Sequence, residues 1–373
     1  MTKKIRIRLG YPYDPSGRTF TGLSQAQLLY SYLSQQEDFE IVESERGVDA
    51  FLFFNGGHGG GAARKKWRKL LQLLGAIGEY FPPVGARALN SPNVPAEREL
   101  ERMRKSNPKM KLIHRLDDRY LFLCKNYGYD KTVARVNQQA DATILQSKYC
   151  GELYAHRNQS IFGELPARPL RNPHLIYNGV DRSVFCEHGP RMDLPGKTRI
   201  VHVSATGMPR KGLSTVLIMA ELLQHNEDIH FFLIGNQLRD PLSGYCIKRL
   251  RNVTHIPMIM DRMELAKHLR SMDVLVFPSR YDCAPNVVLE AMSCGLAVVA
   301  HDSGGTPELM IKDDVQAGLL LQERNPVQAV KTVLENLPQF KHNAVEIVKR
   351  HHMMEHTGAQ YAEVIRNLVA GKG

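Results

Sequence analysis

The chain of 373 residues is long enough for two domains of ordinary size, and its composition, 43% hydrophobic and 23% charged, is that of a globular protein. Six scattered cysteines show neither a Cys-x-x-Cys pair nor a zinc-ligand spacing, which argues against a disulfide scaffold or a zinc finger. The amino terminus lacks the apolar stretch of a signal peptide, and the longest apolar run, Leu70–Gly78, is too short to cross a bilayer. We therefore expect a reduced, cytoplasmic chain without a membrane span.

The formal net charge of +11 is concentrated in the first half of the sequence. Residues 1–195 hold 29 basic against 20 acidic side chains, whereas the remainder holds 20 against 18. This asymmetry indicates a polyanionic partner for the first half, such as an anionic membrane surface, a phosphorylated acceptor or nucleic acid, with solubility alone as the alternative. Because nothing in the sequence resembles a nucleic-acid-binding motif of interleaved basic and aromatic residues, we expect no nucleic-acid partner.

Short apolar runs alternate with segments of helical periodicity along the chain, which is the pattern of βαβ units in a parallel sheet. The strands predicted in the first half are Ile5–Arg8, Ala50–Phe54, Lys111–His114, Ala142–Leu145 and Leu175–Tyr177. Helices are predicted between them, notably Ser24–Leu33 and Lys131–Gln139.

A second series of alternating elements begins after Pro190. Its predicted strands are Arg199–Ser204, His230–Ile234, Val253–Ile256, Val274–Pro278, Leu296–Ala300 and Gly318–Leu321. Its predicted helices are Thr215–Gln224, Arg262–Ser271, Asn286–Met292 and Pro326–Leu337, and a final helical segment, about Val345–Val369, follows the last strand.

Two such series predict an α/β protein with two doubly wound, Rossmann-like domains facing across a cleft. We place the first domain at residues 1–178 and the second at residues 179–350, because Asn178-Gly179 and Gly189-Pro190 interrupt the pattern between them. Ligands of doubly wound sheets bind at the carboxyl ends of the strands, so the cleft is the expected active site.

A polar loop, Ala205–Gly212, follows the first strand of the second series and leads into a helix. Gly207 and Gly212 relieve backbone crowding there, and Arg210 and Lys211 place two cations at the carboxyl end of the strand. Cations and backbone amides in that position suit a diphosphate. The glycine spacing is not that of a phosphate-binding P-loop, and a solvated basic turn is the alternative.

Two carboxylates lie eight residues apart in the later part of the same series. Asp282 follows a buried strand, and Glu290 lies inside an otherwise apolar helix, where it needs either solvent or a partner. One carboxylate can accept hydrogen bonds from both hydroxyls of a ribose, each worth roughly 1.5–3 kcal/mol. The amides at the start of the helix suit phosphate or sugar oxygens.

These features resemble the retaining family-4 glycosyltransferases, glycosyl transferases group 1, which have the GT-B fold. The spacing of Asp282 and Glu290 matches the family's acidic-x7-Glu signature. The other stretches that resemble family landmarks are Ala284–Gly295, His301–Glu308, Pro209–Gly212, Ile113–Asp117, Ala140–Ser147 and Ile176–Asp181. The resemblance covers most of residues 110–325 in the expected order, whereas residues 1–110 resemble the family only loosely.

The resemblance implies that Lys211 neutralises the donor diphosphate, Glu290 holds the nucleoside ribose, Asp282 holds the sugar hydroxyls and His114 faces the transferred sugar from the first domain. The other donor-binding residues it implies are Arg210, Thr206, Gly207, Cys283, Ala284, Pro285, Asn286, Gly304 and Gly305. It implies an acceptor side that includes Tyr11, Gly22 and Arg115. It also implies that a C-terminal helix of about residues 351–373 completes the first domain, and that the enzyme needs no metal or cofactor.

The sequence departs from the family pattern at two positions. Aligned on Lys211 and Gly212, the usual Gly-Arg pair falls on Ala205 and Thr206, so the expected diphosphate arginine is missing and Arg210 is the nearest substitute. An aspartate, Asp282, stands where glutamate is commoner, which shortens the reach to the sugar.

The predicted function is transfer of a sugar from a UDP-, GDP- or other nucleotide sugar to a glycan or lipid-linked acceptor, with retention of configuration and without a metal, as in polysaccharide biosynthesis. The alternatives are an inactive protein that binds a sugar nucleotide or an anionic surface, and a nucleotide-sugar epimerase on the same scaffold. The basic segment Arg64–Lys69, with Trp67 as an aromatic anchor, predicts peripheral association with an anionic membrane, or else a solvated helix face.

Overall fold

The computed structural model divides the chain into two compact units, each built on a six-stranded parallel sheet. The first unit comprises Met1–Tyr13, Tyr30–Ile176 and Gln360–Gly373, and the second comprises Asp14–Leu29 and Tyr177–Ala359. The residues that the structure describes are 3–10, 21–43, 47–54, 97–117, 133–155, 159–160, 163–164, 169–205, 209–235, 247–321 and 325–372.

The sheet of the first unit has the strand order β2-β1-β3-β4-β5-β8, and every neighbouring pair is parallel. Its strands are β1 (Ile5–Leu9), β2 (Phe39–Ile41), β3 (Ala50–Phe54), β4 (Lys111–Leu116), β5 (Ala142–Leu145) and β8 (Pro173–Leu175). The helices connected to it are α1 (Thr21–Ser34), α3 (Glu97–Ser106) and α6 (Lys148–Ala155), and β6 (Gln159–Ser160) pairs with β7 (Gly163–Glu164) in a small antiparallel ribbon. The residues of α1 up to Leu29 belong to the second unit, and those from Tyr30 onward belong to the first. All residues of β3 and β5 are buried, as expected for central parallel strands covered on both faces.

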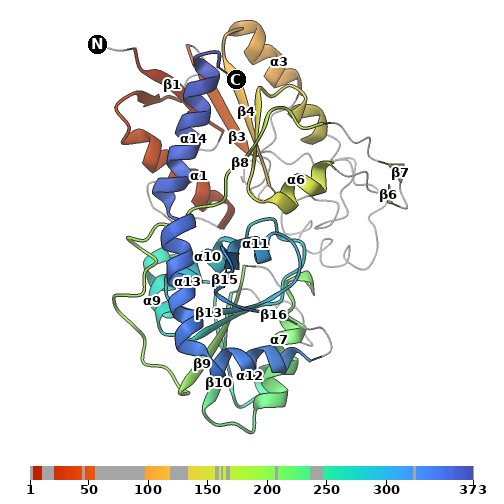
Figure 1. The fold of residues 1–373 in the computed structure, drawn as a ribbon, viewed down its shortest axis with the longest axis vertical. Helices are drawn as coiled ribbons and strands as arrows, with labels where there is room; N and C mark the ends of the chain where they lie inside the picture. The colour runs from red at the N-terminus through yellow and green to blue at the C-terminus, as the bar shows by residue number, and fades with distance from the viewer. Residues whose placement is uncertain are drawn as a thin grey trace, which may run out of the picture. The chain divides into compact units, whose positions relative to one another are not determined.

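The sheet of the second unit has the order β11-β10-β9-β12-β13-β16. Its strands β9, β10, β13 and β16 are labelled in Figure 1. Its strands are β9 (Thr198–Ser204), β10 (Ile229–Gly235), β11 (Val253–Ile256), β12 (Val274–Phe277), β13 (Ala297–His301) and β16 (Gly318–Leu321). Its helices are α7 (Leu213–Leu223), α9 (Arg262–Arg270), α10 (Asn286–Ser293), α11 (Thr306–Met310), α12 (Pro326–Glu335) and α13 (Leu337–His351), and β14 (Ile311–Lys312) pairs with β15 (Val315–Gln316).

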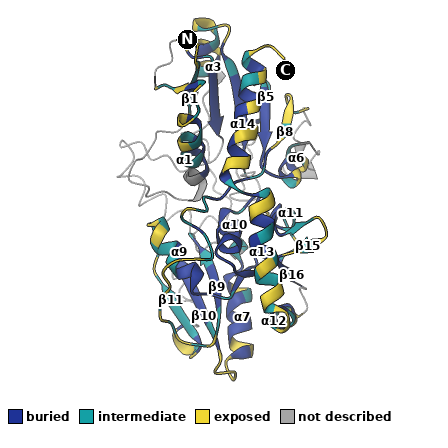
Figure 2. Ribbon diagram, turned by 60° about the vertical axis from the view of Figure 1, so that its left-hand side comes forward, coloured by how far each residue is buried: buried dark blue, intermediate teal, exposed yellow. Residues whose placement is uncertain are grey.

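Two hydrophobic cores cover the two faces of the second sheet. Alternate residues of β12 divide between them: Val274 and Val276 pack with α7 and α12, whereas Leu275 and Phe277 pack with α9, α10 and α13. This alternation follows from the two-residue period of a strand, and it makes the unit doubly wound. Figure 2 shows the inner strands of the sheet mostly buried, the edge strand β11 at intermediate burial, and exposed residues along α12 and α13.

The eleven strands predicted from the sequence each overlap an observed strand, and the predicted α/β class with two Rossmann-like sheets is confirmed. The strand expected to begin at Leu175 instead ends there, and the three-residue edge strand β2 was not predicted. Of the predicted helix Lys131–Gln139, residues 133–137 are helical in the described part of the chain. In the segments that the structure describes, no helix is long and apolar enough to cross a membrane.

The helical segment predicted at about Val345–Val369 is helical in the structure and is divided between two helices, α13 and α14 (Met354–Val369). Val180 causes the break by pairing with Met353: the Val180 amide donates to the His352 carbonyl at 2.8 Å, and the Met354 amide donates to the Val180 carbonyl at 3.1 Å. Residues of α14 up to Ala359 lie with the second unit, and those from Gln360 onward lie with the first.

Candidate active site

Two loops meet at the carboxyl ends of the neighbouring strands β9 and β12. The short 3-10 turn η2 (Pro209–Lys211) follows β9, and residues 278–282 follow β12. The Arg280 amide donates a hydrogen bond to the Arg210 carbonyl at 3.0 Å. Gly212 adopts φ 74°, and a Cβ atom there would lie 2.5 Å from the Pro278 carbonyl oxygen, so glycine is required for the loops to approach this closely.

The carboxylate of Asp282 lies at the centre of this junction. Lys211 donates to its two oxygens at 2.7 and 2.8 Å, and Arg210 Nη1 donates to Oδ1 at 2.9 Å. Ser279 donates its hydroxyl to Oδ2 at 2.5 Å. The Asp282 side chain is 6% exposed, against 20% for Lys211 and 17% for Arg210, so the two cations still reach the surface. A buried carboxylate is stable here because several charge-assisted bonds replace its hydration.

The ionisation of Asp282 follows from its neighbours. Burial raises the pKa of the carboxyl, but the charges of Lys211 and Arg210 and the Ser279 hydrogen bond outweigh burial and lower the pKa below its ordinary value. Asp282 is therefore ionised at neutral pH, and two cations facing one anion leave the cluster with excess positive charge. The Nε atom of Arg210 is buried and has no hydrogen-bond partner among the described residues. Such a junction is chemically suited to an added anion.

The glycine pair at 304–305 supports the loop from the other side. The Gly305 amide donates to the Asp282 carbonyl at 2.9 Å. Gly304 has φ +71°, and a Cβ atom there would lie 2.3 Å from the same carbonyl oxygen, so a side chain would force the two segments apart. The predicted donor-binding pair therefore contacts the backbone of the predicted catalytic aspartate.

Glu290 lies in the second turn of α10, as predicted, and its side chain is buried. Its Oε2 atom has no hydrogen-bond partner among the described residues. Burial raises the pKa of the carboxyl, and the charge of Arg262 opposes this only in part. A buried carboxylate with an unused acceptor oxygen is costly for stability and suits a ligand that brings hydroxyl donors.

The structure brings Asp282, Lys211 and Arg210 together, and it places Cys283, Ala284, Pro285 and Asn286 on the segment that joins Asp282 to α10. Cys283 is fully buried, so it presents no side chain at the surface. Ser279 was not predicted as a site residue, although its position three residues before Asp282 in the same loop could have indicated a contact with that carboxylate. No group of three metal-binding side chains occurs in the described part of the chain.

His114 and Arg115 lie on β4 in the first unit, and both side chains are buried. The His114 ring stacks on Phe53 with centroids 4.6 Å apart, and burial lowers its pKa to about 3, so the ring is neutral. Arg115 donates to Asp117 and, at 3.1 Å, to Gln146. Sugar contact by His114 and an acceptor role for Arg115 stay predictions, and each would require a buried side chain to become accessible.

Several predicted site residues lie outside the described residues: Tyr11, Thr206, Gly207 and the segment Arg64–Lys69. Gly22 lies in the first turn of α1. Their predicted roles therefore stay predictions.

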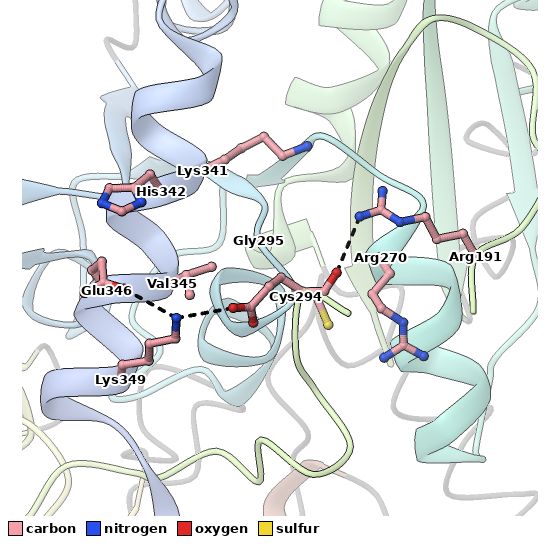
Figure 3. Close-up of a pocket in the computed structure, with 10 residues that line it drawn as sticks. Arg191, Arg270, Cys294, Gly295, Lys341, His342, Val345, Glu346 and Lys349 are labelled. Carbon is pink, nitrogen blue, oxygen red and sulfur yellow. Dashed lines mark hydrogen bonds and ion pairs between the residues drawn. The ribbon is translucent and has the colours of Figure 1, made fainter. Parts of the chain in front are cut away.

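A separate pocket of about 310 Å³ opens beside α13 in the second unit (Figure 3). Three of its charged side chains pair with one another: Lys349 lies 3.3 Å from Glu187 and 3.4 Å from Glu346. Arg270 donates to the carbonyls of Pro190 and Val184 instead. The pocket contains Cys294 at the carboxyl end of α10, whereas Asp282 precedes the amino end of that helix. We assign these contacts to the packing of α13 and not to a ligand site. Cations in this position are stabilised by the carboxyl end of a helix, here α10.

The fold class of the protein is GT-B, which consists of two successive Rossmann-like sheets. Sucrose-phosphate synthase from Thermosynechococcus elongatus superposes with a TM-score of 0.68 and 17% identity, over 99% of this chain and 100% of that one. Anabaena HepE in complex with UDP-glucose superposes with a TM-score of 0.62 and 16% identity, over 97% and 99% of the two chains.

The family follows from the sequence of the second unit. Residues 197–338 match the family model described as Glycosyl transferases group 1, and this segment belongs to that family. An uncharacterized glycosyltransferase of Methanocaldococcus jannaschii is 29% identical over 164 residues, 43% of this chain and 42% of that protein. Alpha-maltose-1-phosphate synthase of Mycobacterium tuberculosis is 28% identical over 165 residues, 39% and 41% of the two chains. The matches thus span about two fifths of each of these relatives.

Proposed function

We propose that the protein is a glycosyltransferase that takes a sugar from a nucleoside diphosphate sugar and transfers it to a glycan or lipid-linked acceptor. The observation that carries the proposal is the buried Asp282 carboxylate with Lys211 and Arg210, at the carboxyl ends of two adjacent parallel strands. That edge is where doubly wound folds bind nucleotides. The group 1 match of residues 197–338 and the UDP-glucose complex of the similarly folded HepE support the same conclusion.

In the proposed reaction, the bond between the anomeric carbon and the diphosphate oxygen breaks, and the bond to the acceptor oxygen forms on the same face of the sugar. The departing phosphate takes the acceptor's proton, so the configuration is retained. Lys211 and Arg210 stabilise the negative charge as it develops on the leaving group. These fixed cations supply the charge stabilisation that a metal ion provides in other transferases, which supports a metal-independent reaction.

The structure gives Arg210 a position that supports its substituting for the missing diphosphate arginine. The Arg210 guanidinium and the Lys211 ammonium both donate to Oδ1 of Asp282, so both cations can face one diphosphate. Its buried Nε donor is unused among the described residues. We therefore propose that Arg210 binds a donor phosphate oxygen, in place of the arginine expected at Thr206.

The function is tested by incubating the protein with a panel of nucleotide sugars. We expect one donor to raise the melting temperature, because ligand binding stabilises the folded state by mass action, and to release nucleoside diphosphate when an acceptor is added. Stabilisation without release would identify an inactive binding protein. Conversion of the donor to its epimer without an acceptor would identify an epimerase.

We also propose that the protein is cytoplasmic and associates with the membrane peripherally through Arg64–Lys69, a segment outside the described residues. We expect it to sediment with vesicles containing anionic lipid and to remain in the supernatant with neutral vesicles. Changing the five basic residues of this segment to glutamine should abolish sedimentation. Equal behaviour with both kinds of vesicle would refute the proposal.

A further inference from the structure

Three buried carboxamide side chains meet at the amino end of α10. Gln25, on α1, donates to the Gly179 carbonyl at 2.7 Å and to Asn286 Oδ1 at 3.2 Å, and it accepts from the Gly179 amide at 3.3 Å. Asn178 donates to the same Asn286 oxygen at 2.9 Å and to the Ala284 carbonyl at 3.1 Å. All of these residues belong to the second unit.

The contacts fix a definite geometry because the groups are buried. Gln25, Asn178 and Asn286 are at most 9% exposed, and a buried amide that loses its partner costs roughly 1–3 kcal/mol. The N-cap of α10 is Pro285, which makes no side-chain cap, so the side chain of the next residue, Asn286, is a polar anchor for the start of the helix. Gln25 supplies one of the donors that hold this anchor.

The anchored stretch leads into the first turn of α10, whose backbone amides are chemically suited to phosphate or sugar oxygens. Asn178 donates a hydrogen bond to the Ala284 carbonyl within this stretch, and it also donates to the side chain of Asn286, the first residue of α10. The Asp282 carbonyl just before it is held by Gly305. Without Gln25, Asn286 Oδ1 would lose one of its hydrogen bonds, and the start of the helix would be held less firmly.

We propose that Gln25 is a positioning residue for the transfer reaction: through Asn286 and the Gly179 peptide it sets the position of the segment Cys283–Pro285 and the direction of the backbone amides at the start of α10. The inference rests on the proposed function. Gln25 touches no substrate in this scheme; it acts on the loop between Asp282 and α10. Small displacements of groups that stabilise a transition state lower the turnover more than they lower ground-state binding.

The test compares Gln25→Leu with the wild type, using the nucleotide sugar that the wild type turns over. We expect kcat to fall about tenfold, while the dissociation constant for the released nucleoside diphosphate changes by less than about twofold, because Lys211 and Glu290 remain. Gln35→Leu is the matched control, since Gln35 is exposed just after the end of α1. It should match the wild type in both quantities.

A second variant, Gln25→Glu, gives a pH readout. Its ionised carboxylate would face two acceptors, the Gly179 carbonyl and Asn286 Oδ1, whereas its protonated form regains one donor. The ratio of variant to wild-type kcat should therefore rise as the pH falls.

A folded Gln25→Leu protein with the kcat of Gln35→Leu, or with equal losses in kcat and binding, overturns the proposal. If Gln25→Leu does not fold, the proposal is overturned when the ratio of Gln25→Glu kcat to wild-type kcat does not change with pH. A wild type that releases no nucleoside diphosphate refutes the proposed function instead.

Discussion

Replacing Lys211 by alanine is expected to lower kcat/KM for the nucleotide sugar by about a hundredfold, the largest loss of the substitutions considered for this protein. The lysine carries one of two positive charges at the junction of the β9 and β12 loops, and its side chain is 20% exposed beside the buried Asp282. An ammonium group has three donors, and two of them serve Asp282, so a phosphate oxygen can be bound as well. The measurement is release of nucleoside diphosphate at saturating acceptor.

Two further variants separate the charge of Lys211 from its packing. Lys197→Ala is the matched control, because Lys197 is 82% exposed in the same unit and pairs with Asp228 at 3.0 Å; it should keep activity within about twofold of the wild type. Lys211→Arg keeps the charge and should retain more activity than Lys211→Ala. A Lys211→Ala protein with more than half the wild-type turnover would exclude the lysine from the donor site.

The sheets could be predicted from the sequence because buried parallel strands are continuous apolar runs. Val274–Phe277 and Ala50–Phe54 are examples, and each is buried at every residue. The edge strand β2 has three residues, too few for a period to be visible. The break between α13 and α14 could not be predicted either, because its cause is a pairing between Val180 and Met353, 173 positions apart in the chain.

The candidate site could be predicted only in part, because some of its contacts join residues that are far apart in the sequence. The acidic spacing singled out Asp282 and Glu290, and the basic loop singled out Lys211. That Arg210 and Lys211 bind Asp282 directly depends on the adjacency of β9 and β12, which a linear pattern does not contain. The bond from Gln25 to Asn286 spans 261 residues and carries no local signal.

Glu290→Gln is expected to move stability and activity in opposite directions. Burial raises the pKa of the Glu290 carboxyl above its ordinary value, so the folded protein disfavours the charged form. Between the ordinary pKa and the raised one, the folded state binds more protons than the unfolded chain, and stability therefore falls as the pH rises through that interval. At low pH, where the carboxyl is protonated in both states, this penalty vanishes. Glutamine carries no charge, so the variant should melt a few degrees higher than the wild type at neutral pH and show a smaller difference in acid.

The same substitution should lower kcat/KM for the donor by about tenfold or more, because glutamine has one acceptor oxygen where the carboxylate has two for the ribose hydroxyls. Thermal melts across pH and donor kinetics on the same preparations provide the measurement. Glu221→Gln is the control, since Glu221 is exposed on α7 and should change neither quantity. A residue kept only for packing would give a variant of higher stability and full activity, and that pair of results would remove Glu290 from the donor site. Higher stability with lost activity has one physical reading: the fold tolerates a buried charge at Glu290 because the donor requires it.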